Sequence, residues 1–210
     1  MIALVDLRIS NVGSIRHALA RVGCPDTVEA TAASVPRASA LIIPGVGSFG
    51  DGMASLREQG LVEPIRRAAQ EGMPLFGICL GMQLLAFESD EHGRHEGLGL
   101  LEGRVVTLAP TDPRFRVPNI GWCDVRSIRS GVLFGDQPGG CFYHVHSYHL
   151  VPKDRRVIAA AIDYSGQEIV VAVEQENIFG VQFHPEKSQD DGLDFLARFV
   201  RHAAAPVHSR

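Results

Sequence analysis

The sequence of 210 residues contains no apolar run long enough to cross a membrane and no excess of basic charge. A membrane-spanning helix needs about 20 apolar residues, and the opening run "MIALVDL" is far shorter. Lys and Arg total 20 against 24 Asp and Glu, which gives a formal net charge of −4. This balance argues against general binding to nucleic acid or to anionic membranes. We expect a cytoplasmic protein with neither partner.

Cysteine is also scarce. The four cysteines, Cys24, Cys79, Cys123 and Cys141, lie far apart, with no CxxC pair and no secretory leader ahead of them. That usage indicates a reduced compartment rather than a disulfide framework. We interpret Cys24, Cys123 and Cys141 as structural residues.

What is present is typical of a globular protein, with 45% hydrophobic and 21% charged residues. We expect one domain over residues 1–210, with a loose tail from about residue 203. Continuous apolar runs at 2–5, 40–44 and 74–78 predict strands covered on both faces. Helical patterns follow them, at 14–23, 53–72 and 80–89.

The second half of the chain changes character. Its apolar segments predict mostly strands joined by polar or Gly/Pro turns, with a closing helix at 192–203. Strands that alternate with helices favour a parallel sheet wrapped on both faces. We therefore predict an α/β fold whose central, mostly parallel sheet continues into a mixed or antiparallel extension.

One short segment, "GICLG" (77–81), places Cys79 between two glycines, after an apolar strand and before a helix. This is the pattern of a nucleophile elbow, where a side chain larger than glycine would collide in the tight turn. The start of a helix also favours a thiolate over a thiol. The alternative is a small buried core residue, a common place for free cysteine.

A thiolate nucleophile needs a base, and the segment "GVQFHPEKS" (180–188) supplies a candidate. His184 follows an apolar run, and Glu186 stands two residues further on. On an extended segment these side chains project to the same side, so Glu186 could orient the His184 ring. The alternative is a structural histidine at the end of a strand.

A third segment, "PGVGSFG" (44–50), also follows a predicted strand. Backbone N–H groups in such a turn can point at a developing oxyanion. An ordinary turn or a phosphate cradle would look similar, although the Lys-Ser/Thr of a P-loop is missing. All three segments fall at the carboxyl ends of predicted strands, where open α/β sheets place their sites. Together they predict acyl transfer, which a thiol protease or esterase would also perform.

The segments "PGVG", "GICLGMQLL" and "GVQFHPEKS" resemble the signature segments of class I (triad) glutamine amidotransferases, over nearly the whole chain. The resemblance implies that family's three-layer fold and hydrolysis of L-glutamine to glutamate and ammonia, without cofactor or metal. It implies Cys79 as nucleophile, His184 as base and Glu186 as its orienting partner. The oxyanion hole would comprise Val46, Gly47 and Leu80, and the glutamine-binding residues would be Gln83, Glu91, Tyr143, Ser147 and Tyr148.

Further segments, among them "SNVGSIRHAL", "VPNIGW" and "FYHVHSYHL", resemble the glutaminase subunits of imidazole glycerol phosphate synthases. That branch implies a heterodimer in which ammonia passes through a channel to a (β/α)8-barrel cyclase that makes imidazole glycerol phosphate and AICAR in histidine biosynthesis. Asn11, Trp122 and Lys187 match positions at that interface or channel mouth. The resemblance also implies low activity of the chain alone, with a peptide flip near Val46 on activation.

The chain departs from the branch at several positions. Arg8 and Ser10 replace glycines, "NIGWC" (119–123) replaces the usual His-Met-Gly-Trp-Asn, and His144 stands where a Phe is usual. These differences bear on the partner more than on the chemistry. One alternative is a paralogous subunit that supplies ammonia to a sugar amidotransferase in surface-polysaccharide biosynthesis, and another is a catalytically silent regulatory subunit.

Two neighbouring histidines allow one further hypothesis. His144 and His146 stand at i and i+2 on a predicted strand, so a metal pair is conceivable. No Cys, Asp or Glu nearby completes a ligand set. We therefore expect no metal.

Overall fold

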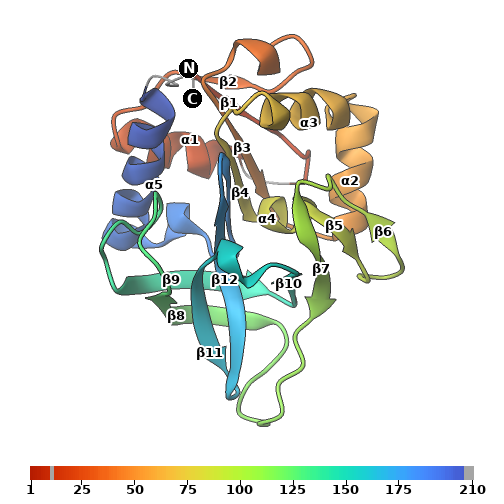
Figure 1. Ribbon diagram of the computed structural model, residues 1–210, viewed down its shortest axis with the longest axis vertical. Helices are drawn as coiled ribbons and strands as arrows, with labels where there is room; N and C mark the ends of the chain where they lie inside the picture. The colour runs from red at the N-terminus through yellow and green to blue at the C-terminus, as the bar shows by residue number, and fades with distance from the viewer. Residues whose placement is uncertain (10–11, 206–210) are drawn as a thin grey trace.

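Figure 1 shows the computed structural model of the chain, which describes residues 1–9 and 12–205. Its main feature is a nine-stranded sheet. From one edge to the other the strands are β2 (Thr27–Glu29), β1 (Ile2–Leu4), β3 (Ala40–Gly45), β4 (Leu75–Cys79), β13 (Ile178–Val181), β12 (Gln167–Gln175), β11 (Ile158–Tyr164), β8 (Asn119–Ser127) and β9 (Gly139–His146).

The direction of the strands changes in the middle of this sheet. The neighbours from β2 to β13 pair in parallel, and those from β13 to β9 pair antiparallel. The strands β1, β3 and β4 are short and fully buried, because helices cover both of their faces. The predicted α/β fold, with a parallel centre and an antiparallel extension, is confirmed.

A second sheet of four strands was not predicted. Its order is β10 (Tyr148–Pro152), β7 (Leu101–Thr107), β5 (Ala86–Ser89) and β6 (His95–Glu96). The helix predicted over 80–89 is correspondingly wrong in its second half. It ends at Leu84 as α4 (Leu80–Leu84), and the chain continues as β5, which pairs with β7.

Four longer helices complete the three layers. They are α1 (Val12–Arg21), α2 (Phe49–Glu58), α3 (Val62–Gln70) and α5 (Gln189–Ala204), and short 3-10 turns occur at η1 (Val35–Arg37), η2 (Arg155–Val157) and η3 (Pro185–Lys187). In Figure 1, α1 and α5 lie on one side of the large sheet, and α2 and α3 lie on the other.

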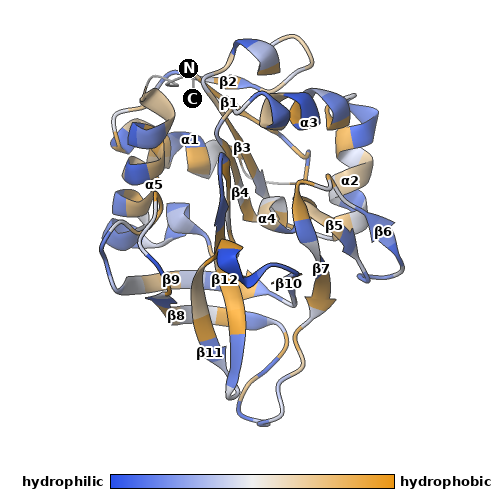
Figure 2. Ribbon diagram, in the orientation of Figure 1, coloured by the Kyte–Doolittle hydropathy of each residue, from blue (hydrophilic) through white to orange (hydrophobic). Residues whose placement is uncertain are grey.

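The core is correspondingly divided into two clusters. One contains the apolar face of α1 and α5, including Ile15 and Phe199, and the other contains that of α2 and α3, including Leu56 and Ile65. Figure 2 shows the same separation of core and surface: β11 and β12 carry hydrophobic stretches in orange, and the outer strand β6 is hydrophilic and blue. Among the described residues, no helix is both long enough and apolar enough to span a membrane.

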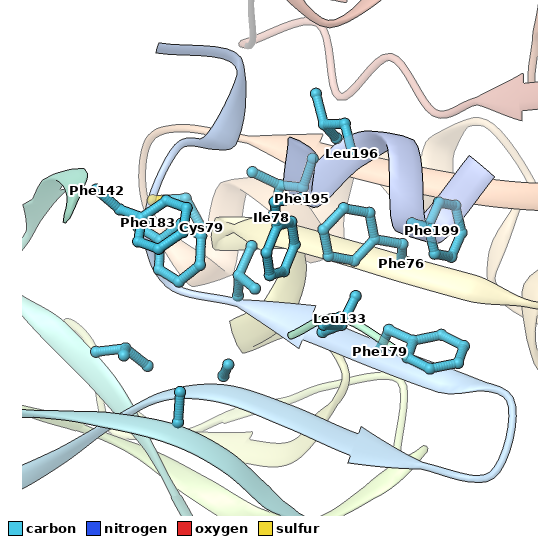
Figure 3. Packing of buried hydrophobic residues seen from close by; sticks show 14 of the residues in the cluster. Phe76, Ile78, Cys79, Leu133, Phe142, Phe179, Phe183, Phe195, Leu196 and Phe199 are labelled. Carbon is cyan, nitrogen blue, oxygen red and sulfur yellow. The ribbon is translucent and has the colours of Figure 1, made fainter. Parts of the chain in front are cut away.

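Aromatic side chains fill the first cluster beneath the end of β4. Phe142 of β9 stacks on Phe183 with ring centroids 4.1 Å apart, and Phe195 of α5 meets both rings edge-on. Figure 3 shows this group beside Cys79. Phe195 also packs against Phe76 of β4. These contacts hold β4, β9, α5 and the segment after β13 together, so the residues at the strand ends rest on a rigid base.

The parallel register brings three strand ends together. Gly45 of β3 lies opposite Cys79 of β4, and Val181 of β13 lies opposite Ile78. The segments that follow these strands therefore begin next to one another, at the edge where open α/β sheets place their sites. At the other end of the chain, α5 continues to Ala204, past the start of the predicted loose tail.

Candidate active site

Cys79 lies at a sharp turn between β4 and α4. Its φ of 53° and ψ of −109° are unusual for a residue with a side chain. Glycines on both sides allow this turn. A Cβ at Gly81 would lie 1.6 Å from the carbonyl oxygen of Ile43, and one at Gly77 would lie 2.5 Å from the carbonyl oxygen of Gly81. The structure therefore has the strand, turn and helix of a nucleophile elbow.

His184 and Glu186 are joined directly. His184 Nδ1 lies 2.8 Å from Glu186 Oε1, and both side chains are buried. A carboxylate only accepts hydrogen bonds, so Nδ1 carries a proton. The other ring nitrogen, Nε2, is buried without a hydrogen-bond partner of ordinary length among the described residues. Nε2 is thus the nitrogen available for proton transfer.

The backbone around His184 is fixed by β9 and η3. The His184 N–H donates to the carbonyl oxygen of Tyr143 at 2.9 Å. The Ser188 hydroxyl donates to the His184 carbonyl at 2.6 Å and accepts from the Tyr143 N–H at 3.0 Å. Pro185 begins η3 and ends the extended segment. The ring is therefore held by its side-chain partner and by its own backbone.

The pKa of His184 reports its surroundings. Burial lowers this pKa, but the interactions of the imidazole with the nearby Cys79 sulfur and with the Glu186 carboxylate outweigh burial and raise the pKa to about 10. At neutral pH the imidazole is therefore protonated and can give a proton to a leaving group. Cys79, His184 and Glu186 form one interacting set.

A cavity of about 530 Å³ opens beside Cys79. Most of the predicted oxyanion and substrate-binding residues line it, namely Val46, Gly47, Leu80, Gln83, Glu91, Ser147 and Tyr148. The wall is completed by residues that sequence reasoning did not assign to a site, namely His92, Thr107, Val117, Pro118, Val145 and His146. The cavity has space for a small polar molecule whose reacting end meets the cysteine.

The turn after β3 lies next to the elbow. Gly47 has a φ of +105°, which an L side chain rarely adopts, and a Cβ there would lie 3.1 Å from Ile9 Cδ1. Leu80 is the first residue of α4, where a helix leaves its backbone N–H groups without intrahelical partners. The turn starts opposite Cys79 in the β3–β4 register and Leu80 follows Cys79 directly, so both predicted oxyanion segments adjoin the elbow and line the cavity.

The amide of Gln83 is largely committed to the protein. Its Nε2 donates to the carbonyl oxygen of Tyr148 and to Gln182 Oε1, each at 3.0 Å. Both amide hydrogens are therefore used, and only Oε1 remains to face the cavity. Any contact of Gln83 with a ligand would accordingly be that of an acceptor.

Glu91 has a structural task in addition to lining the cavity. Its Oε2 accepts a hydrogen bond of 2.6 Å from the N–H of Phe49, the first residue of α2. A carboxylate at a helix N-terminus satisfies a free N–H and opposes the helix dipole. Glu91 thus connects the cavity to the helix that follows the Val46–Gly47 turn.

Tyr143 is not a cavity residue in the structure. Its ring packs against Trp122, with centroids 6.0 Å apart, and Lys187 Nζ lies 6.0 Å from the Tyr143 ring centroid. Tyr143 therefore joins two residues predicted to meet a partner, and it supports His184 through its backbone. The third predicted interface residue, Asn11, lies outside the described residues, as does Ser10.

His144 and His146, which we considered as a metal pair, are hydrogen-bonded to each other. His144 Nδ1 lies 3.3 Å from His146 Nε2, and His146 Nδ1 lies 2.9 Å from the Tyr148 carbonyl oxygen. Burial is the main cause that lowers the pKa of His144 to about 3 and that of His146 to about 4, so both are neutral at pH 7. Among the described residues, no group of three or more His, Cys, Asp or Glu side chains could hold a metal ion.

Arg8 illustrates how the chain accommodates one departure. It has a φ of 60°, a conformation that glycine adopts without strain, and its N–H donates to Asp6 Oδ1 at 2.8 Å. The backbone therefore retains the shape expected for glycine while an exposed arginine occupies the position.

Comparisons with known proteins match one family over nearly the whole chain. A family model described as "Glutamine amidotransferase class-I" matches residues 3–203. A Moorella thermoacetica protein named imidazole glycerol phosphate synthase subunit HisH is 45% identical over 211 residues, covering 99% of each chain. A Geobacillus thermodenitrificans protein of the same name is 45% identical over 203 residues, covering 95% of each.

Solved structures share the fold at lower identity. The structure of PurLQS from Thermotoga maritima matches with a TM-score of 0.73 and 23% identity, covering 96% of this chain and 97% of that one. A crystal structure titled glutamine amidotransferase matches with a TM-score of 0.71 and 24% identity, covering 98% and 100%. At this identity the likeness concerns the fold alone.

Proposed function

The chain belongs to the class I glutamine amidotransferase family, and from that premise we propose that it is the glutaminase subunit of an imidazole glycerol phosphate synthase. The observation that carries the proposal is Cys79 in the wall of a cavity of about 530 Å³, together with the buried pair of His184 and Glu186 that interacts with it. The relatives named as this subunit align over almost their whole length. No observation favours a sugar amidotransferase partner.

The reaction begins with attack of the Cys79 sulfur on the side-chain amide carbon of glutamine. The carbonyl oxygen becomes an oxyanion, and we propose that the backbone amides of Leu80 and of the Val46–Gly47 turn donate hydrogen bonds to it. Protonated His184 gives a proton from Nε2 to the nitrogen, and ammonia leaves. The product of this half-reaction is a thioester between Cys79 and the glutamyl group.

Water completes the cycle. His184, now neutral, takes a proton from water, which attacks the thioester carbon. The second tetrahedral intermediate collapses to glutamate and the Cys79 thiolate, and His184 is again protonated. Glu186 holds the ring through Nδ1 in both halves, so that Nε2 always faces the reacting groups.

The surface around the cavity supports a partner. The cavity-lining residues Val46 and Val117 are 37% and 42% exposed, and Ile120 and Trp122 of β8 are 62% and 48% exposed. Large apolar side chains exposed together at the mouth of a site are typical of an interface. We propose that the (β/α)8-barrel cyclase covers this mouth and receives ammonia before it reaches bulk water.

The test is glutamate release from glutamine by the purified chain, alone and with a barrel-type cyclase from the same source, with and without the cyclase's phosphoribulosyl ligand. We expect weak release by the chain alone and strong stimulation that requires both additions. Release that ignores the cyclase would retain a glutaminase and reject this partner. No release in any mixture would reject the glutaminase.

A further inference from the structure

The structure assigns Gln182 as a positioning residue that holds the Cys79 sulfur through a side-chain hydrogen bond, an inference that rests on the proposed glutaminase function. Gln182 Nε2 lies 3.7 Å from Cys79 Sγ, within the range of a hydrogen bond to sulfur. The Gln182 side chain is completely buried, with an exposed fraction of 0%. A buried amide in this position is costly unless its polar atoms are paired.

Backbone geometry explains how Gln182 reaches the sulfur. Val181, the last residue of β13, lies opposite Ile78 in the parallel pair with β4. Gln182 comes directly after Val181, and Cys79 comes directly after Ile78. Gln182 and Cys79 therefore occupy corresponding positions, one residue beyond this pair. Gln182 and His184 both belong to the short segment between β13 and η3, and both interact with Cys79. The Gln182 N–H donates to the Val171 carbonyl oxygen at 2.9 Å, which fixes its backbone.

The chemistry of the neighbours fixes which end of the Gln182 amide faces the sulfur. The Tyr148 carbonyl oxygen can only accept, so the Gln83 atom 3.0 Å away is its NH2 nitrogen. That same nitrogen lies 3.0 Å from Gln182, so the Gln182 atom facing it is the carbonyl oxygen. The Gln182 NH2 group therefore faces Cys79. The orientation of both amides follows from one backbone carbonyl.

The network joins the nucleophile to the wall of the cavity. The Tyr148 carbonyl also accepts from His146 Nδ1 at 2.9 Å, and Tyr148 and His146 both line the cavity. From Tyr148 through Gln83 and Gln182 to Cys79, consecutive hydrogen bonds link the backbone carbonyl, the two amides and the sulfur. Such a connected network is stiff, because each member restricts the next.

The donated hydrogen bond acts on the reacting atom itself. A negatively charged sulfur is stabilised by an N–H donor, and the direction of that donor restricts the rotation of the cysteine side chain. His184 supplies the proton for the leaving group, whereas Gln182 has no ionisable proton to give. Its part is therefore to hold Sγ against the cavity while His184 carries out proton transfer.

The first test replaces Gln182 by Met, which conserves its volume and removes the donor. With the cyclase and its ligand present, we expect kcat for glutamate release to fall about 10- to 100-fold, with KM changed less than about threefold. Gln59→Met is the matched control, because Gln59 Nε2 also donates to a backbone carbonyl and a side-chain oxygen, those of Asp6 and Ser55, away from the cavity. The control should retain kcat.

The second test does not use glutamine. Alkylation of Cys79 by iodoacetamide at neutral pH is followed by mass spectrometry of the peptide that contains Cys79, with Cys79→Ala as the blank for the other cysteines. We expect Gln182→Met to slow alkylation and Gln182→Glu to slow it further, because a carboxylate keeps the shape and the acceptor for Gln83 but repels a thiolate.

The outcomes separate the two proposals. Alkylation that is fastest with Gln182, slower with Met and slowest with Glu supports the role of Gln182. If the unaltered chain shows this order of rates in its variants but releases no glutamate, only the glutaminase function is rejected. Equal alkylation rates in the folded variants, or a kcat in Gln182→Met that matches the Gln59→Met control, would overturn the role of Gln182. Gln182→Glu keeps the test decisive if Gln182→Met does not fold.

Discussion

Gly45 lies directly opposite Cys79 in the parallel pair of β3 and β4. The Val46–Gly47 turn therefore starts beside the nucleophile, although more than thirty residues separate the two in the chain. Backbone register, rather than any side-chain contact, places the two halves of the proposed oxyanion site together. The site consequently depends on the parallel core as much as on its reacting groups.

We expect Cys79→Ala to lower glutamate release by several orders of magnitude, because no neighbouring side chain can replace the thiolate. Release is measured with the cyclase and its ligand present. Cys123→Ala, at a half-buried cysteine outside the cavity lining, is the control and should retain activity. A Cys79→Ala variant as active as this control would reject the proposed nucleophile.

The pH dependence of kcat/KM should reflect the raised pKa of His184. The reaction needs a protonated imidazole, so activity is expected to persist above neutral pH and to decline as the pH rises through about 10. Glu186→Gln removes one of the groups that raise this pKa, so the alkaline decline should move to lower pH. We also expect kcat to fall about 100-fold or more. An unchanged alkaline limb in Glu186→Gln would contradict the assignment of Glu186.

The glycine at position 81 should tolerate no side chain. Alanine favours helices over glycine by about 1 kcal/mol, yet a Cβ here would lie 1.6 Å from the Ile43 carbonyl oxygen. We expect Gly81→Ala to lower the free energy of unfolding in urea by about 3 kcal/mol or more. Gly60→Ala, at a φ of +64° with open space around it, should cost about 1 kcal/mol. Equal costs would argue against the close approach of α4 to β3.

The buried histidine pair should make the fold less stable in acid. In the unfolded chain His144 and His146 take up protons near the ordinary value of 6.5, whereas the folded chain holds their pKa values at about 3 and about 4. Stability from these groups is therefore present above pH 6.5 and is lost as the pH falls. Each contributes a slope of up to about 1.4 kcal/mol per pH unit.

Removing one histidine tests this slope directly. His144→Phe should reduce the proton uptake on unfolding by about one at mildly acidic pH, as measured from urea unfolding at several pH values. Comparison with the unaltered chain cancels other groups, including His149, whose pKa burial also lowers. Equal pH slopes in the two proteins would show that His144 is not held neutral in the fold.

The exposed Trp122 should matter only to the complex. Trp122→Ala is expected to weaken binding of the cyclase by about tenfold or more, because a large aromatic side chain at the centre of an interface contributes strongly. Phe87→Ala is the matched control, since Phe87 is equally exposed at 48% but lies on the small sheet. Binding is measured by titration calorimetry. Equal losses for both variants would place the interface elsewhere.

The reacting groups could be predicted from the sequence because their signals are local. The glycines around Cys79 specify a tight turn within a few residues. The predicted pairing of His184 with Glu186 is present, but the reason given for it is wrong, because the 3-10 turn η3 rather than an extended segment brings the carboxylate to the ring. The placement of these segments at one edge followed from a general property of parallel sheets. Nothing beyond the chain's own short motifs was needed for either inference.

The second sheet and Gln182 could not be predicted in the same way. Residues 86–89 continue an apolar helical pattern, and they form β5 only because they pair with residues of β7. Gln182 lies in an apolar run that predicts a strand, and nothing local marks its contact with Cys79, which lies 103 positions away. Tyr143 was assigned by resemblance to the substrate site, whereas its ring packs with Trp122 and Lys187.

Glu91 has a consequence for inhibitor design. It faces the cavity and also caps α2, the helix that follows the Val46–Gly47 turn. A compound with a cationic group against this carboxylate would compete with the Phe49 N–H for its charge and would loosen the start of α2. Such a compound would act on the geometry of the turn as well as occupy the cavity.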